Sequence, residues 1–192
     1  ADIPDVVAEF CSIPEAYAAD AEHEDLFVRA MRAVTELHIE RSPWYRKFAE
    51  IRGINPARIK SSADVLALPP VHANFFKFHE IRSIPESMVT AHLTSSGTTG
   101  QKSQIFFDEF TFTHARAMVD RTMAARGAVS DTPANYLVNA YEPFEGLKVG
   151  TSNTNQYLMR FAPVAEQFWS LRHIGGGRHE FDPFGAIQSL ER

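Results

Sequence analysis

The amino-acid sequence predicts an α/β protein in which an N-terminal helical lobe precedes a layered α/β domain. Residues 1–70 show helical spacing of apolar side chains and short helix signals. Strand patterns rich in β-branched residues begin only after residue 88, and from there strand and helix patterns alternate. We therefore expect a helical lobe over residues 1–70 and an α/β subdomain over residues 71–192.

One long apolar stripe opens the helical lobe. Its members recur at three- and four-residue spacing, as on a helix with one buried face: Leu26, Phe27, Ala30, Met31, Val34 and Leu37. Ser42 and Pro43 predict an N-cap followed by proline at the first helical position, and Gly53 ends that helix. A turn at Asn55-Pro56 leads to another short helix, which ends before Pro69-Pro70.

The α/β part begins with two short strands around a polar loop. Residues 88–93 and 103–107 have strand character, and the loop lies between them. Helical spacing returns over residues 112–123 and is followed by a C-cap at Gly127. Residues 135–140 predict a buried strand.

The last part of the chain predicts two further helices. Ala165, Phe168, Trp169 and Arg172 recur at helical intervals, which favours a helix over residues 161–171. Three consecutive glycines, 175–177, then indicate a turn, and a last helix starts at Asp182-Pro183 and continues through Ile187 and Leu190.

Composition excludes several function classes. The chain has 192 residues, a formal charge of -5 and a pI near 5.9, so it lacks the basic surface of a nucleic-acid-binding protein. The single Cys11 excludes a disulfide framework and a thiolate zinc cluster. No run of 18 apolar residues and no signal peptide is evident, so we expect a cytoplasmic protein without a membrane span. The eight histidines show no metal-ligand spacing, and we assign no metal site to protein side chains.

Residues 94–103 form a segment rich in hydroxyl side chains and glycine, and this segment predicts a binding function. Hydroxyl side chains there surround two glycines, and glycines let backbone N–H groups turn toward an anion while hydroxyls add donors. The predicted phosphate-binding residues are Ser95, Ser96, Gly97, Thr98, Thr99, Gly100 and Lys102. A Walker A loop is excluded because Gly97 and Gly100 are too close, no Gly-Lys pair occurs, and a strand follows.

The segment Ser95–Gly100 resembles the first signature of the adenylate-forming superfamily, commonly written T/S-S-G-T-T-G-x-P-K. Lys102 and Ser103 depart from it, standing where proline and lysine are usual. Upstream, the run Arg41–Phe48 resembles phenylacetate–CoA ligases and LuxE-type acyl-protein synthetases. So do the turn residues that follow it, from Gly53 through Asn55-Pro56 to Pro69. The stretch Val71–Phe78 is more similar to the LuxE type. Residues 38–110 contain this similarity, and they place the chain in the N-terminal domain of such an enzyme.

The resemblance implies a two-step reaction with ATP and Mg²⁺. A carboxylic acid, a long-chain fatty acid in the LuxE type, becomes an acyl-adenylate, and a thiol then takes the acyl group. In LuxE-type enzymes that thiol is a cysteine late in the chain, which delivers the acyl group to a reductase partner. The resemblance thus implies an acyl reductase or another acyl-accepting protein as the partner. Cys11 lies in the wrong region for that role.

No adenine, ribose or C-terminal catalytic motif is evident, so catalytic residues stay unassigned, and we expect the chain to be an incomplete fragment that is inactive alone. Two alternatives remain open: a non-catalytic nucleotide-binding or oligomerisation domain derived from this fold, and an aryl-acid CoA ligase fragment.

Overall fold

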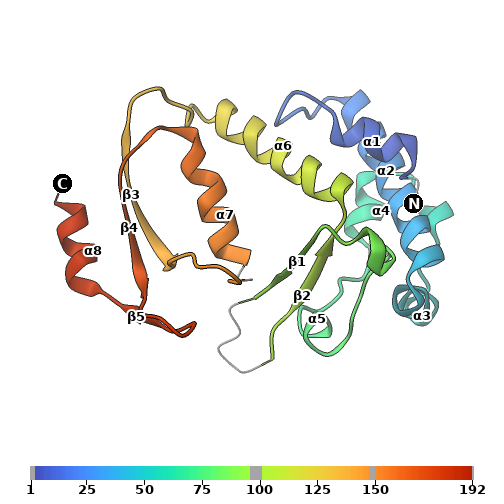
Figure 1. Ribbon diagram of the computed structural model, residues 1–192. Helices are drawn as coiled ribbons and strands as arrows, with labels where there is room; N and C mark the ends of the chain where they lie inside the picture. The colour runs from blue at the N-terminus through green and yellow to red at the C-terminus, as the bar shows by residue number, and fades with distance from the viewer. Residues whose placement is uncertain (1–2, 96–100, 148–149, 192) are drawn as a thin grey trace. The chain divides into compact units, whose positions relative to one another are not determined.

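The computed structural model describes residues 3–95, 101–147 and 150–191 (Figure 1). The chain divides into two compact units. Unit 1 contains Ala1–His92 and Ser103–Thr122, and unit 2 contains Leu93–Lys102 and Met123–Arg192. Both helices and sheets are present, so the predicted α/β class is confirmed. Residues 1–70 all lie in unit 1, while residues 71–192 contribute to both units, and the domain boundary at residue 70 stays a prediction.

Unit 1 is mainly helical. Its elements up to the first strand are α1 (Asp5–Cys11), α2 (Ala21–Arg41), α3 (Pro43–Arg52), η1 (Pro56–Arg58), α4 (Ser62–Leu66), α5 (Phe75–Phe78) and η2 (Glu86–Met88). The longest, α2, begins at an Asp20 N-cap whose side chain accepts hydrogen bonds from Glu22 N and His23 N. The buried residues of α2 include Leu26, Ala30 and Leu37, so the predicted apolar stripe is confirmed as a core face.

The junction between α2 and α3 follows the predicted cap signals. Ser42 is only 2% exposed, and its Oγ accepts a hydrogen bond from Tyr45 N at 3.3 Å. Pro43 occupies the first helical position, where its missing N–H costs nothing. Gly53 ends α3 in the left-handed region with φ 66°. Local sequence signals therefore determine both ends of this helix.

Two short strands follow, β1 (Ala91–Thr94) and β2 (Gln104–Phe107), and they pair in a two-stranded sheet (Figure 1). Just before β1 begins, Thr90 N donates to Phe107 O, the last residue of β2, at 2.8 Å. The chain then enters α6 (Glu109–Ala125), and Gly127 follows in the left-handed region, as predicted. The two strands thus lie where the sequence predicts them, and a long helix comes next.

Unit 2 is built on a three-stranded sheet. Its elements are β3 (Ala134–Tyr141), α7 (Gly150–Leu158), η3 (Met159–Phe161), β4 (Val164–His173), β5 (His179–Phe181) and α8 (Pro183–Leu190). The strand order is β3-β4-β5, with β3 and β4 parallel and β4 and β5 antiparallel. A core cluster of Val138, Ala140, Met159 and Trp169 packs on this sheet, with Tyr136 against it.

The predicted helix over residues 161–171 is wrong, because most of that segment is the strand β4. Pro163 stands just before the strand, a position that suits proline and opposes a helix continuing through it. Ladder pairing with β3 and β5 then outweighs the helical spacing. Consecutive residues Trp169 and Ser170 are both buried, at 5% and 2% exposed, as expected for a strand that is covered on both faces.

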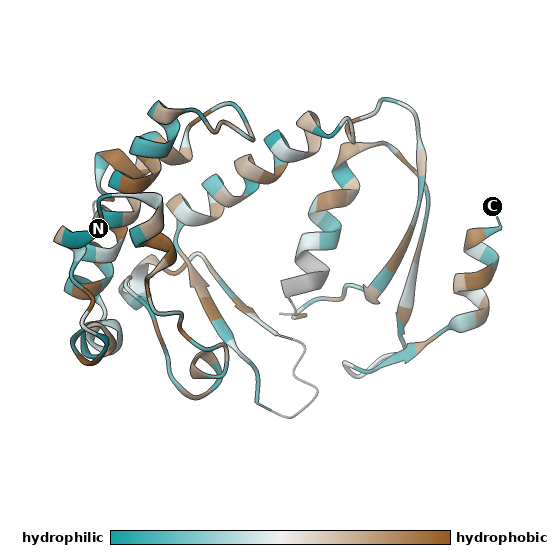
Figure 2. Cartoon of the chain, turned by 180° about the vertical axis from the view of Figure 1, so that it is seen from behind, coloured by the Kyte–Doolittle hydropathy of each residue, from teal (hydrophilic) through white to brown (hydrophobic). Residues whose placement is uncertain are grey.

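The last helix, α8, lies against β4 and presents apolar residues outward. Asp182 caps it, accepting from Gly185 N at 2.8 Å, as the Asp-Pro start predicts. A Cβ on Gly185 would lie 2.4 Å from Phe168 Cζ, so only glycine permits this approach. Figure 2 shows the apolar character of α8, whose most exposed large side chains are Phe184, Ile187 and Leu190.

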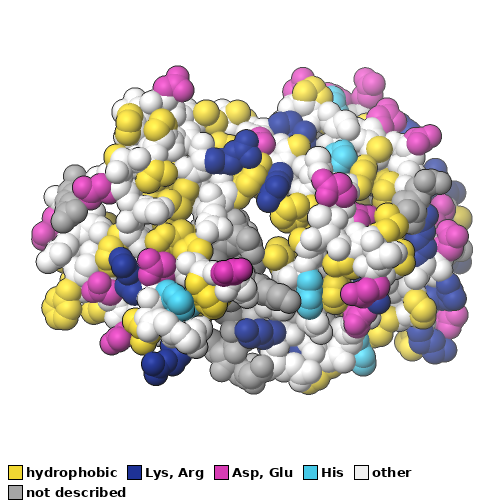
Figure 3. Space-filling model, viewed as in Figure 1, with side chains coloured by type: hydrophobic (Ala, Val, Ile, Leu, Met, Phe, Trp, Pro, Cys, Tyr) yellow, Lys and Arg dark blue, Asp and Glu magenta, His cyan; other side chains and the backbone are white. Residues whose placement is uncertain are grey.

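Charges of both signs are interspersed over the face seen in Figure 3. Across the described ranges, the longest helices are too short or too polar to cross a membrane.

Candidate functional site

The predicted phosphate-binding residues lie between β1 and β2 in the sequence. Residues 96–100, which include Ser96, Gly97, Thr98, Thr99 and Gly100, lie outside the described residues. The two described members of the predicted set, Ser95 and Lys102, are both exposed. The structure therefore describes the strands before and after this segment, and the role of the segment's side chains stays a prediction.

Aromatic contacts hold the unit 1 side of this sheet. The ring of His92 on β1 stacks on Phe106 on β2, with centroids 4.5 Å apart and planes 17° apart. Arg82 approaches the same Phe106 ring, with its guanidinium carbon 5.6 Å from the centroid. This cation–π and stacking arrangement ties the strand pair to the segment before it.

Asp108 fixes the turn from β2 into α6. It is 3% exposed, and its Oδ1 accepts a hydrogen bond from Thr111 N at 2.8 Å. Its backbone O also accepts from Phe112 N at 3.0 Å. A buried carboxylate at a helix start is stabilised by such N–H donors. Asp108 therefore sets the direction in which α6 leaves the strand.

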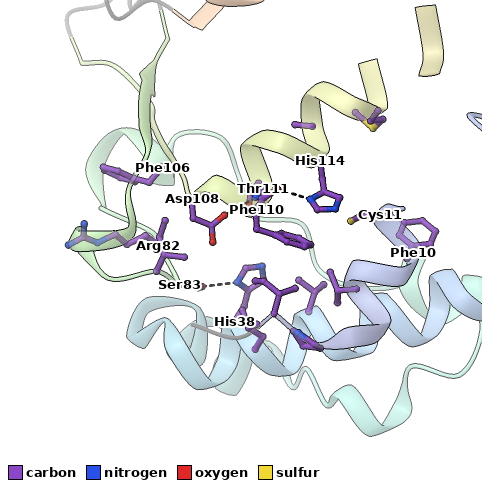
Figure 4. Close-up of a pocket in the computed structure, with 18 of the residues that line it drawn as sticks. Phe10, Cys11, His38, Arg82, Ser83, Phe106, Asp108, Phe110, Thr111 and His114 are labelled. Carbon is purple, nitrogen blue, oxygen red and sulfur yellow. Dashed lines mark hydrogen bonds between the residues drawn. The ribbon is translucent and has the colours of Figure 1, made fainter. Parts of the chain in front are cut away.

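A cavity of about 780 Å³ lies inside unit 1, between α1, α2, the part of α6 from Phe110 to Arg121 and the segment around residues 71–84 (Figure 4). Most of its lining is apolar. Figure 4 places Arg82 and Phe106 toward one end and Phe10 and Cys11 toward the other, with Phe110 between them. The size and character suit a small-molecule pocket, since such sites are concave, mostly apolar and furnished with a few polar groups.

The polar groups of the cavity are mostly engaged within the protein. His38 Nδ1 lies 2.7 Å from Ser83 Oγ, and His114 Nδ1 lies 2.8 Å from Phe110 O. Arg121 Nη2 donates to Cys11 O at 3.1 Å. Burial lowers the pKa of His38, because desolvation disfavours the imidazolium form. We infer that His38 is neutral at pH 7.

Cys11 also lines this cavity. Burial raises the pKa of its thiol, and the nearby Arg121 charge opposes that effect in part. A thiol with a raised pKa is a poor nucleophile, because the thiolate is the reactive form. The expectation that Cys11 has no acyl-accepting role agrees with this environment.

Sequence reasoning missed the cavity. Val34 and Leu37 of α2 and Ala115 and Met118 of α6 line it, and the sequence predicted these residues only as parts of helical apolar patterns. A signal was present: each stripe includes a histidine, His38 in α2 and His114 in α6, on the same face as apolar residues. Buried histidine on an apolar face is compatible with both a core and a pocket, so the pattern alone does not distinguish them.

A second cluster of aromatic and histidine rings lies in unit 2, around the turn from β4 to β5. The His173 ring stacks on Phe144 at 4.4 Å between centroids and lies 5.3 Å from His179. His179 Nε2 is 2.8 Å from Glu142 O, and His173 N donates to Glu142 Oε2 at 2.8 Å. No cluster of three or more His, Cys, Asp or Glu suited to a metal ion occurs in the part of the chain that the structure describes. These rings pack the turn together.

The fold of this chain is shared with part of a solved ligase. Structures of 2-hydroxyisobutyryl-CoA ligase share the fold at low identity. The postadenylation state in complex with 2-HIB-AMP matches with a TM-score of 0.55 and 18% identity, covering 81% of this chain and 33% of that chain. The complex with R3-HIB-AMP matches with a TM-score of 0.56 and 17% identity, covering 85% of this chain and 34% of that chain. The thioesterification state with 2-HIB-AMP and CoA matches with a TM-score of 0.54 and 20% identity, covering 85% of this chain and 34% of that chain. The present chain thus spans about a third of the length of that ligase.

The particular family follows from the sequence itself. The family model of LuxE, the acyl-protein synthetase, matches residues 1–145. The chain therefore belongs to the LuxE acyl-protein synthetase family, and the predicted resemblance is confirmed. A search of curated proteins found no match.

Proposed function

We propose that this chain supplies the phosphate-binding part of an enzyme that activates a carboxylic acid with ATP as an acyl-adenylate, for transfer to a thiol. The observation that carries the proposal is the hydroxyl- and glycine-rich segment 95–100, joined to Lys102, in a chain of the LuxE family. The segment stands in the sequence between the strands β1 and β2, which supports the proposal. For the substrate we propose a long-chain fatty acid, and for the final acceptor an acyl reductase partner, as the family name and resemblance suggest.

In the proposed first step, a carboxylate oxygen attacks the α-phosphorus of ATP, and the bond to the β-phosphate oxygen breaks. Acyl-AMP forms and pyrophosphate leaves. The segment's backbone N–H groups and hydroxyls hold the β- and γ-phosphates as charge grows on the leaving group, which is positioning and electrostatic stabilisation. In the second step a thiolate attacks the acyl carbonyl, a thioester forms, and AMP leaves.

Magnesium would enter with its nucleotide. Mg²⁺ retains several waters and is commonly held by substrate phosphates with one or two carboxylates.

The test has two parts. Calorimetric titration of ATP–Mg²⁺ into the 192-residue chain, with Thr98→Ala, Thr99→Ala and Ser103→Ala, asks whether this segment binds phosphate. We expect both threonine variants to weaken binding and Ser103→Ala to have the smaller effect, since Ser103 departs from the signature. Acid-dependent pyrophosphate exchange, measured on the protein at its natural length, asks about the chemistry. Nucleotide binding without acid-dependent exchange would favour the non-catalytic alternative.

A further inference from the structure

We propose that the cavity of unit 1 is a binding site for the alkyl chain of a long-chain carboxylate, with Arg121 at the head-group end, and that it fills without nucleotide. The identity of the head group as a carboxylate rests on the proposed acid activation. The location of the site rests on unit 1 alone, because every lining residue belongs to that unit.

The size and lining of the cavity fit a single alkyl chain. Its volume is about 780 Å³, within the range of small-molecule pockets. The apolar walls come from different elements: Phe10 from α1, Val34 and Leu37 from α2, Ile84 from the segment before η2, and Phe110 and Ala115 from α6. Figure 4 shows labelled side chains distributed along the cavity from Phe106 to Phe10. Water gains few hydrogen bonds against such walls, so an apolar occupant is favoured.

The charges of the lining favour an anionic head group near Cys11. Arg121, on α6, uses one of its five N–H donors on Cys11 O at 3.1 Å. At the other end, Arg82 already pairs with Glu80 at 2.8 Å and with Glu86. Arg41 also lines the cavity, from the end of α2.

The acidic and titratable groups of the lining are compatible with this placement. The Asp108 carboxylate is committed to the start of α6 through Thr111 N. Glu15 lines the cavity from an exposed position, and His38 and His114 each have a hydrogen-bond partner within the protein. We therefore assign the carboxylate to Arg121, whose guanidinium lies beside Cys11 O in the lining.

Calorimetry with dodecanoate and octanoate, both below micelle formation and without ATP, tests the site on the 192-residue chain. Each buried methylene strengthens binding by about fourfold, so four extra methylenes give about 250-fold tighter binding of dodecanoate. Affinities within about threefold of each other would overturn the proposal, because the tail would then not be buried.

A matched pair of variants on α6 locates the binding. Ala115→Leu places bulk in the cavity wall, while Ala124→Leu makes the same change at an exposed position of the same helix outside the lining. We expect at least tenfold weaker dodecanoate binding for Ala115→Leu and an unchanged affinity for Ala124→Leu. Equal affinities would place dodecanoate elsewhere and overturn the assignment. Because Ala115→Leu could disturb packing, the wild-type chain gives a second measurement. Cys11 is its single thiol, and dodecanoate should slow its alkylation by iodoacetamide at least fivefold. An unchanged alkylation rate would also refute the site.

The head group is tested by charge. Arg121→Gln should weaken the binding of dodecanoate about tenfold. The same change should leave the affinity for dodecyltrimethylammonium unchanged or make it tighter. Equal binding of both amphiphiles to the wild type would overturn the carboxylate assignment. Dodecanoate binding without any acid-dependent exchange would refute the proposed function alone, and exchange without dodecanoate binding in this cavity would refute this inference alone.

Discussion

His38 shows how burial of one side chain makes stability depend on pH. Its ring is held in unit 1 by Ser83 Oγ and lies 5.7 Å from the Tyr45 ring, between centroids. Burial lowers its pKa below the ordinary value of about 6.5, so the folded state resists protonation there. The unfolded chain protonates His38 at the ordinary value. The contribution of neutral His38 to the free energy of unfolding is thus fully present above about pH 6.5, and it is lost as the pH falls toward the lowered pKa.

We expect His38→Gln to flatten the acid side of the stability profile. Between pH 7.5 and 5.0 the wild type should lose free energy of unfolding more steeply than the variant, by at most about 1.4 kcal/mol per pH unit. Denaturant unfolding at several pH values measures this difference. His72→Gln, an exposed histidine of the same unit, is the control and should follow the wild type. Parallel profiles for wild type and His38→Gln would contradict the assigned cause.

At Thr98 and Thr99 we expect activity and stability to separate. If their hydroxyls hold departing pyrophosphate, each Thr→Ala change should cost about 3–4 kcal/mol in the transition state for adenylation, a rate loss of about 10²–10³-fold. The sequence predicts an exposed loop here, so the melting temperature should stay nearly unchanged. Pyrophosphate exchange and thermal melting on the same variants, at the protein's natural length, provide the check. Equal losses of activity and stability would indicate a structural role instead.

At the scale of helices and strands, local chemistry determined what the sequence could predict. The cap residues Ser42, Gly53 and Asp182 act on their own neighbours, and each ends or begins a helix where the sequence predicts it. The strand β4 depends on pairing with β3, about 30 residues earlier, and its helical spacing was misleading. The cavity was missed for the same reason, because it needs α1, α2 and α6 together, and no single segment encodes it.

The start of α3 offers a direct measurement of a cap. Ser42→Ala should reduce the free energy of unfolding by about 1–2 kcal/mol, since it removes the acceptor for Tyr45 N at a buried position. Ser61→Ala removes the corresponding acceptor for Asp64 N at the exposed start of α4. There water replaces the lost partner, so the loss should be smaller. Chemical denaturation of both variants compares them, and equal losses would mean that burial does not strengthen the cap.

At the scale of the whole molecule, each unit contains one of the two tryptophans. Trp44 lies in unit 1, stacked on Phe48 with ring centroids 5.5 Å apart, and Trp169 lies in the core cluster of unit 2. A single phenylalanine substitution therefore leaves a fluorescence reporter in one unit only. This distribution allows the stability of the two units to be followed separately.

We expect the two units to unfold with different midpoints, because each has its own buried residues and separate units need not unfold together. Trp169→Phe reports unit 1 through Trp44, and Trp44→Phe reports unit 2 through Trp169. Adding Ser42→Ala should lower the midpoint that Trp44 reports and leave the Trp169 midpoint unchanged. Circular dichroism of each variant controls for destabilisation by the reporter change itself. Coincident midpoints that shift together would show one cooperative structure.

The outward side chains of α8 have a consequence for the chain in concentrated solution. Phe184 is 79% exposed, Ile187 55% and Leu190 73%, all within eight residues. Short-range attraction between such helices competes with the repulsion from a net charge of -5. Salt at 0.1 M limits the range of this repulsion to about 10 Å and leaves the apolar attraction in place. The osmotic second virial coefficient, measured by static light scattering, should therefore become more negative as salt is added, and Phe184→Ser with Leu190→Ser should return it toward positive values.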